Sequence, residues 1–134
     1  MNQQPPARLE NETVEAYIVR LKQSGFSLRG NAKVLRPGHK YQLKNFEDPN
    51  SFQILQFIEK EPKMPGSPEL ITVNDGTTNE AVLEMLIDRA QQLFNKFPSP
   101  ETASAIDHMR QALEQFELRT LRRLARGVEG QAKA

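Results

Sequence analysis

The chain has 134 residues, of which 37% are hydrophobic and 26% are charged, and its formal net charge is +1. This length predicts about one domain with a modest core, and the small net charge means that any electrostatic function depends on local clustering. The absence of cysteine excludes a disulfide framework and a cysteine-based zinc site. No apolar run approaches the roughly 18 residues of a transmembrane helix.

The N-terminal region is predicted to be a tail followed by a strand. Residues 1–11 are polar and lack an apolar centre, so we expect a disordered tail and not a signal peptide. In residues 13–22 (TVEAYIVRLK), Tyr17, Val19 and Leu21 fall on one face and alternate with Ile18, Arg20 and Lys22, which predicts a strand. A short helix over residues 12–22 is the alternative.

Turn signals divide the next part of the chain into further strands. The expected turns are SG at 24–25, RPGH at 36–39 and EDPN at 47–50, and the expected strands include 26–30, 40–46 and 52–60. The strand segments are rich in aromatic and β-branched residues, which favour extended structure. We therefore expect a β-rich region over residues 12–73, built as a four- or five-stranded antiparallel meander.

The hydrophobic period changes after the proline-rich segment at residues 61–68, which we interpret as a loop. Apolar residues then recur three or four positions apart, as in an amphipathic helix: Val82, Leu83, Leu86, Ile87, Ala90, Leu93, Phe94 and Phe97. Thr77 and Glu80 form a T-x-x-E capping box, which predicts the start of this helix.

A second helix is predicted to follow almost at once. Ser99 is a favourable N-cap residue, Pro100 suits the first helical position, and Arg126 followed by Gly127 predicts the end. The residues expected to be buried are Ile106, Met109, Leu113, Phe116, Thr120, Leu121 and Leu124. Two long helices with a short connection predict an antiparallel hairpin over residues 74–130, and an α+β fold for the chain.

The second helix is expected to extend about eight residues, or ~12 Å, beyond the start of the first. This extension, RTLRRLAR, carries Arg119, Arg122, Arg123 and Arg126. It would lie beside the NDGTT segment at residues 74–78 and the first backbone N–H groups of a helix, and both the arginines and the helix start favour a phosphate. Arginine also suits the last turn of any helix, so a purely structural explanation stays open.

Two segments resemble a known family: NDGTTNEAVLEMLIDR at residues 74–89, and FPSPETASAIDHMRQALEQFELRTLRRLARGVEG at residues 97–130. They are similar to the phage anti-CBASS and anti-Thoeris sponges, which sequester cyclic nucleotide immune signals. The most specific feature is the R-T-x-x-R-x-x-R-G-V-E-G ending. The resemblance covers residues 73–130, a little under half of the chain.

This resemblance implies a binding protein without enzymatic activity, metal or cofactor, in the cytoplasm of the infected bacterial host. It implies a homo-oligomer, often a hexamer, that holds cyclic di- or trinucleotides or cyclic ADP-ribose isomers in pockets between subunits. Carried over by position, the ligand-binding residues are Asn79, Arg89, Arg119, Thr120 and Arg123. Arg119 and Arg123 are expected to hold phosphates, and Thr120 or Asn79 to contact ribose or base. Arg89 is expected either to join them or to pair with Glu117.

Two other classes of function remain as alternatives. The same arginines could bind a nucleic-acid backbone, although the small net charge argues against this. The chain could also be a scaffold without a ligand. An enzyme is not expected, because we find no metal-ligand spacing, phosphate-binding glycine loop or nucleophile motif.

Overall fold

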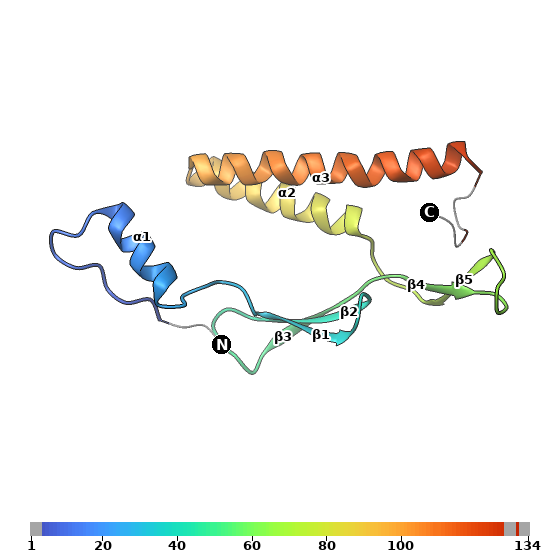
Figure 1. Cartoon of the computed structure of the whole chain (residues 1–134), viewed down its shortest axis with the longest axis horizontal. Coiled ribbons are helices and arrows are strands. Elements are labelled where there is room, and N and C mark those ends of the chain that lie inside the picture. The colour runs from blue at the N-terminus through green and yellow to red at the C-terminus, as the bar shows by residue number, and fades with distance from the viewer. Residues whose placement is uncertain (1–3, 128–130, 132–134) are drawn as a thin grey trace. The chain divides into compact units, whose positions relative to one another are not determined.

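The computed structural model describes residues 4–127 and residue 131, and it has two small antiparallel sheets followed by two C-terminal helices (Figure 1). The α+β class is therefore confirmed. The elements in chain order are α1 (Val14–Gln23), β1 (Ala32–Arg36), β2 (Lys40–Lys44), β3 (Phe52–Gln56), β4 (Glu59–Pro62), β5 (Leu70–Asn74), α2 (Asn79–Lys96) and α3 (Pro100–Ala125). The chain divides into an N-terminal unit, residues 1–55, and a C-terminal unit, residues 56–134.

Helix α1 replaces the strand expected at residues 13–22, so that prediction is wrong and the helical alternative is correct. The Thr13 side chain accepts a hydrogen bond from the Ala16 N–H at 3.1 Å and caps the helix. Glu15 lies in the first turn and Arg20 in the last, where each charge is favourable in the field of the helix dipole. The ends of this segment therefore favour a helix, whereas its alternating pattern had indicated a strand.

The segment before α1 is hydrogen-bonded to it. The Arg20 guanidinium donates to both carboxylate oxygens of Glu12 at 2.8 Å and to the Ala7 carbonyl at 2.7 Å. The Tyr17 hydroxyl donates to the Pro6 carbonyl at 2.6 Å. Hydrogen bonds from Arg20 and from the Leu9 N–H lower the pKa of Glu12 to about 2. The expected disordered tail thus supplies contacts to α1, and its residues 1–3 lie outside the described residues.

The first sheet has the strand order β1-β2-β3. Strands β1 and β2 are antiparallel, with Ala32 opposite Leu43 and a register shift between Val34 and Arg36. No strand forms at residues 26–30, contrary to expectation, because Gly25 and Gly30 both have positive φ and interrupt extended structure at either end.

The second sheet is a two-stranded ribbon of β4 and β5, with Pro62 opposite Leu70 and Glu59 opposite Asn74. The single strand expected at residues 52–60 is instead divided between the two sheets. It divides because Phe57 forms a parallel bridge with Thr77, so the chain changes pairing partner there. Five strands form, but as a three-stranded and a two-stranded sheet and not as one meander.

The two C-terminal helices lie side by side (Figure 1). The Ser99 hydroxyl accepts from the Thr102 N–H at 3.1 Å, Pro100 begins α3, and Gly127 follows its end with φ of 69°, as predicted.

Burial along α3 differs from the expected pattern. Ile106 is the buried hydrophobic residue of the described chain, whereas Leu121 and Leu124 are 60% and 56% exposed and were wrongly expected to be buried. Helix α3 has 26 residues and α2 has 18, so the last turns of α3 extend beyond the α2 residues that could cover them.

Candidate functional site

The entry to α2 is fixed by backbone contacts with the chain between β3 and β4. The Thr77 N–H donates to the Gln56 carbonyl at 2.9 Å, and the Ile58 N–H donates to the Thr77 carbonyl at 2.9 Å. A Cβ atom on Gly76 would lie 2.5 Å from the Gln56 carbonyl oxygen, so this close approach requires glycine. The NDGTT segment is therefore held against residues 56–58.

Thr78, and not Thr77, caps helix α2. The Thr78 hydroxyl accepts from the Ala81 N–H at 3.2 Å, so the capping box predicted from Thr77 and Glu80 is displaced by one residue. The physical reason is that the backbone of Thr77 is already paired with Gln56 and Ile58. Thr77 ends the strand-like segment, and the helix begins at Asn79.

Among the described residues of the C-terminal unit, two charged side chains are buried, Glu59 and Arg123, each 5% exposed. The Glu59 carboxylate accepts from the Asn74 side-chain amide at 2.9 Å. The Arg123 guanidinium donates to the Gln131 carbonyl at 2.7 Å, and Gln131 forms an antiparallel bridge with Glu69. These contacts connect the end of α3 to the β4–β5 ribbon, whose second strand leads into α2.

This junction contains three of the predicted ligand-binding residues on one helix. Arg119, Thr120 and Arg123 lie within about one turn of α3. Arg119 is exposed, Thr120 is half-buried, and Arg123 is buried. Helix α3 is eight residues longer than α2, which equals the excess length that the sequence predicts for it.

The other two predicted residues lie on α2. Asn79 is exposed at the first position of the helix, and Arg89 is exposed ten residues later, about 15 Å further along the axis. In the part of the chain that the structure describes, Arg89 makes no hydrogen bond or ion pair, so the predicted pair with Glu117 does not form. Within one chain, Asn79 therefore lies at the start of α2, and Arg89 lies too far along the helix to be next to it.

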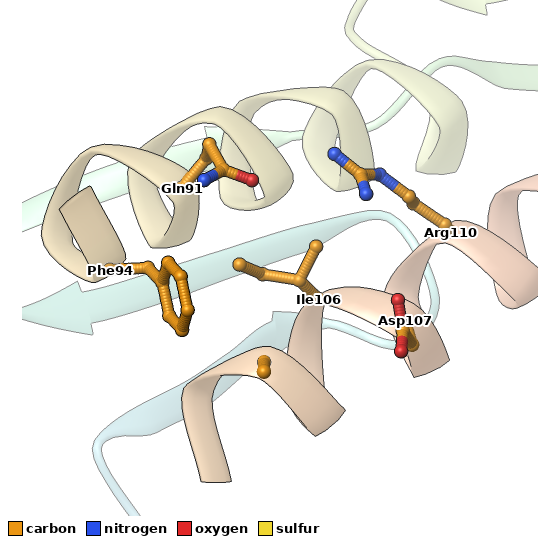
Figure 2. Close-up of a pocket in the computed structure, with 6 residues that line it drawn as sticks. Gln91, Phe94, Ile106, Asp107 and Arg110 are labelled. Atoms are coloured by element: carbon orange, nitrogen blue, oxygen red, sulfur yellow. The ribbon is translucent and has the colours of Figure 1, made fainter. Parts of the chain in front are cut away.

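A shallow groove of about 140 Å³ lies between α2 and α3 (Figure 2). Phe94 and Ile106 supply its apolar wall, and Gln91, Asp107 and Arg110 supply polar groups. Drug-sized ligands usually occupy about 300–1,000 Å³, so this groove is too small to enclose a nucleotide within one chain. The polar residues of the groove were not predicted, because they lie on helical positions without a motif.

The buried Glu59 was also missed. Glu59 and Asn74 are 15 positions apart and are brought together only by the register of β4 and β5. Among residues 4–127 and 131, no group of three or more His, Asp or Glu side chains is arranged to hold a metal ion. No helix within the same residues has the length and apolar character needed to cross a membrane.

Comparison with known proteins adds no further assignment. No protein-family model matches the chain, and no curated protein is significantly similar to it.

Proposed function

We propose that the protein binds and sequesters a cyclic nucleotide immune signal, a cyclic di- or trinucleotide or a cyclic ADP-ribose isomer, without cleaving it. The observation that carries this proposal is the arginine-bearing extension of α3 beyond α2, anchored to the ribbon that leads into the start of α2. Arginine side chains and a helix N-terminus together suit a compact ligand with several phosphates. The similarity of residues 73–130 to the sponge family supports the same function.

In this proposal α2 and α3 act as an antiparallel hairpin, and Arg119 is the main phosphate ligand because its side chain is exposed. Thr120 and Asn79 contact ribose or base. Arg123 already donates to the Gln131 carbonyl, but a guanidinium has five N–H donors and can serve a phosphate as well. Arg89 contacts a ligand that two subunits bind jointly.

The ligand pocket is proposed to lie between subunits of a homo-oligomer, of which a hexamer is one form. The groove between α2 and α3 is too small for a nucleotide. Exposed apolar side chains such as Leu121, Leu124 and Phe97 provide surface for contacts between subunits. A sponge of this kind acts in the cytoplasm of the infected bacterial host and needs no catalytic group, metal or cofactor.

Titration calorimetry with a panel of cyclic di- and trinucleotides and cyclic ADP-ribose isomers tests the proposal. We expect tight, stoichiometric binding of at least one of them. Arg119→Ala should weaken it at least tenfold, since a hydrogen bond to a charged group contributes about 1.5–3 kcal/mol. Arg110→Ala is the matched control, because Arg110 is an exposed arginine on the same helix.

The outcomes of this titration distinguish the junction between α3 and the start of α2 from the groove between the helices, and they test the function itself. Loss of binding in Arg119→Ala alone supports the junction between α3 and the start of α2. Loss in Arg110→Ala alone moves the site to the groove between the helices and contradicts our assignment. No heat with any nucleotide contradicts the proposed function itself.

A further inference from the structure

Charge is strongly segregated along the chain. Residues 16–46 carry seven Lys and Arg residues and no Asp or Glu, whereas the rest of the chain carries 11 Lys and Arg against 17 Asp and Glu. The small net charge of the whole protein therefore conceals a basic segment. Four of these seven residues lie on the sheet of the N-terminal unit: Lys33 and Arg36 on β1, and Lys40 and Lys44 on β2.

The pairing of β2 with β3 follows from the hydrogen bonds at the turn that joins them. The Asn45 N–H donates to the Ser51 carbonyl at 2.9 Å, and the Gln53 side-chain amide donates to the Asn45 side-chain oxygen at 3.2 Å. In an antiparallel pair this register places Lys44 opposite Phe52. Two residues further along each strand, it places Gln42 opposite Ile54.

One face of the sheet therefore combines lysines with apolar side chains. Residues directly opposite, and residues two apart on one strand, share a face. Lys33 is opposite Gln42 in the pairing of β1 with β2. We define the basic sheet face by these residues: Lys33, Lys40, Gln42, Lys44, Phe52 and Ile54.

The basic sheet face is accessible. Phe52 and Ile54 are 48% and 47% exposed, and Lys33 and Lys44 are exposed. At the hairpin end, Arg36 of β1 lies opposite Lys40 of β2. The two strands therefore carry four basic residues, and this charge favours an anionic partner.

We propose that the basic sheet face binds single-stranded nucleic acid, as a second binding site separate from the proposed cyclic-nucleotide site. Lysines on the flanks contact successive phosphates, and an exposed aromatic ring among them offers a surface on which a base stacks. A duplex hides the faces of its bases, so the combination with Phe52 favours a single strand. Residues 16–46 carry no carboxylate, and Glu47 and Asp48 lie in the turn between β2 and β3, outside both strands.

Fluorescence anisotropy of the full chain with a labelled oligothymidylate of about ten nucleotides tests this proposal. The double variant Lys33→Gln, Lys44→Gln should weaken binding about tenfold and reduce the slope of log affinity against log salt by about 1.4, or about 0.7 per lost phosphate contact. Phe52→Leu retains an apolar side chain, and it should also weaken binding about tenfold through lost stacking.

The control removes the same charge elsewhere. Lys60→Gln, Lys96→Gln changes two exposed lysines of the C-terminal unit and should leave the affinity unchanged. Arg119→Ala should also leave it unchanged, which separates this site from the cyclic-nucleotide site. Circular dichroism of each variant checks that the fold is retained.

The proposal is overturned if the single strand does not bind at low salt, or if both double lysine variants weaken it equally. Equal binding of a duplex with no effect of Phe52→Leu would show a general attraction of phosphates and contradict stacking. Competition by polyglutamate at equal concentration would indicate an acidic protein as the partner and contradict a nucleic-acid site.

Discussion

The arginines near the end of α3 differ in their surroundings although they are close in sequence. Arg123 is buried and donates to the Gln131 carbonyl at 2.7 Å. Arg119 is exposed and, among the residues that the structure describes, makes no hydrogen bond or ion pair. The family resemblance implies the same phosphate-binding role for both residues. The hydrogen bond from Arg123 to the Gln131 carbonyl distinguishes them.

This difference predicts unequal effects on stability. Arg123→Ala should lower the free energy of unfolding by about 1.5–3 kcal/mol, because a buried charge-assisted hydrogen bond is lost. Arg119→Ala should change it by no more than about 0.5 kcal/mol, as is usual at exposed positions. Urea denaturation followed by circular dichroism measures both. Equal midpoints for the two variants would contradict the structural role of Arg123.

The Glu12–Arg20 pair predicts a pH dependence at the N-terminal end of the chain. The pKa of Glu12 is lowered from 4.5 to about 2, chiefly by its hydrogen bonds from Arg20. A carboxyl with a lowered pKa in the folded state stabilises that state above the unfolded pKa. The contacts of Glu12 with α1 should therefore weaken as the pH falls from about 4.5 to about 2.

Carbon-13 NMR of the Glu12 carboxyl measures this pKa directly. We expect a midpoint near pH 2 in the native chain and, in Arg20→Gln, a midpoint that rises toward 4.5. Arg29→Gln is the control, since Arg29 is an exposed arginine of the same unit and should leave the midpoint unchanged. A native midpoint near 4.5 would show that the pair does not form in solution.

At the scale of elements, capping residues predicted the ends of α3 more reliably than hydrophobic periodicity predicted the type of the α1 segment. Ser99, Pro100 and Gly127 mark the ends of α3 as predicted, because each acts through its own backbone neighbourhood. The segment that forms α1 satisfies two periods at once. Tyr17, Val19 and Leu21 alternate as in a strand, whereas Val14, Tyr17, Ile18 and Leu21 have helical spacing. Periodicity over ten residues could not decide between them.

Strand pairing was harder to predict than helix ends. Strand β5 was not predicted, because the pairing with β4 leaves no local pattern. Strand β4 also includes Glu61 and Pro62, so the loop expected at residues 61–68 begins two residues later than predicted. The bridge between Phe57 and Thr77 also joins residues 20 positions apart. That bridge displaced the predicted cap of α2 from Thr77 to Thr78.

The position of this cap can be tested with two variants that each remove only a hydroxyl. Thr78→Val should lower the free energy of unfolding by about 1 kcal/mol, since the Ala81 N–H loses its acceptor. Thr77→Val should have a smaller effect, because the structure gives its hydroxyl no capping role. Guanidinium denaturation compares them. A larger loss for Thr77→Val would restore the cap predicted from the sequence.

At the scale of the whole molecule, the division of the chain differs from the change in sequence character. The hydrophobic period changes after residues 61–68, and the β-rich region was expected to end at residue 73, yet the compact units meet at residues 55 and 56. Strands β4 and β5 join the C-terminal unit because Thr77 pairs with Phe57 and Gln131 pairs with Glu69. Net charge was equally uninformative, because the basic segment and the acidic remainder nearly cancel.

The exposed apolar residues of α3 predict self-association. Among the described residues Ile106 is the buried hydrophobic side chain, so the two long helices leave Leu121 and Leu124 open to contacts with another copy. Light scattering at micromolar concentration should give a mass that is a multiple of 15.3 kDa. Leu121→Gln should lower this mass, whereas Val19→Gln on α1 should not. A native mass of 15.3 kDa would contradict an oligomeric sponge.

The central claim is that the protein holds a cyclic nucleotide and leaves it chemically unchanged. The most direct measurement incubates the protein with each member of the nucleotide panel, removes free ligand, heats the protein and analyses what is released. We predict that at least one member is retained in stoichiometric amount and recovered intact. Recovery of a linear product would indicate an enzyme, and retention of none of the panel would contradict the sponge.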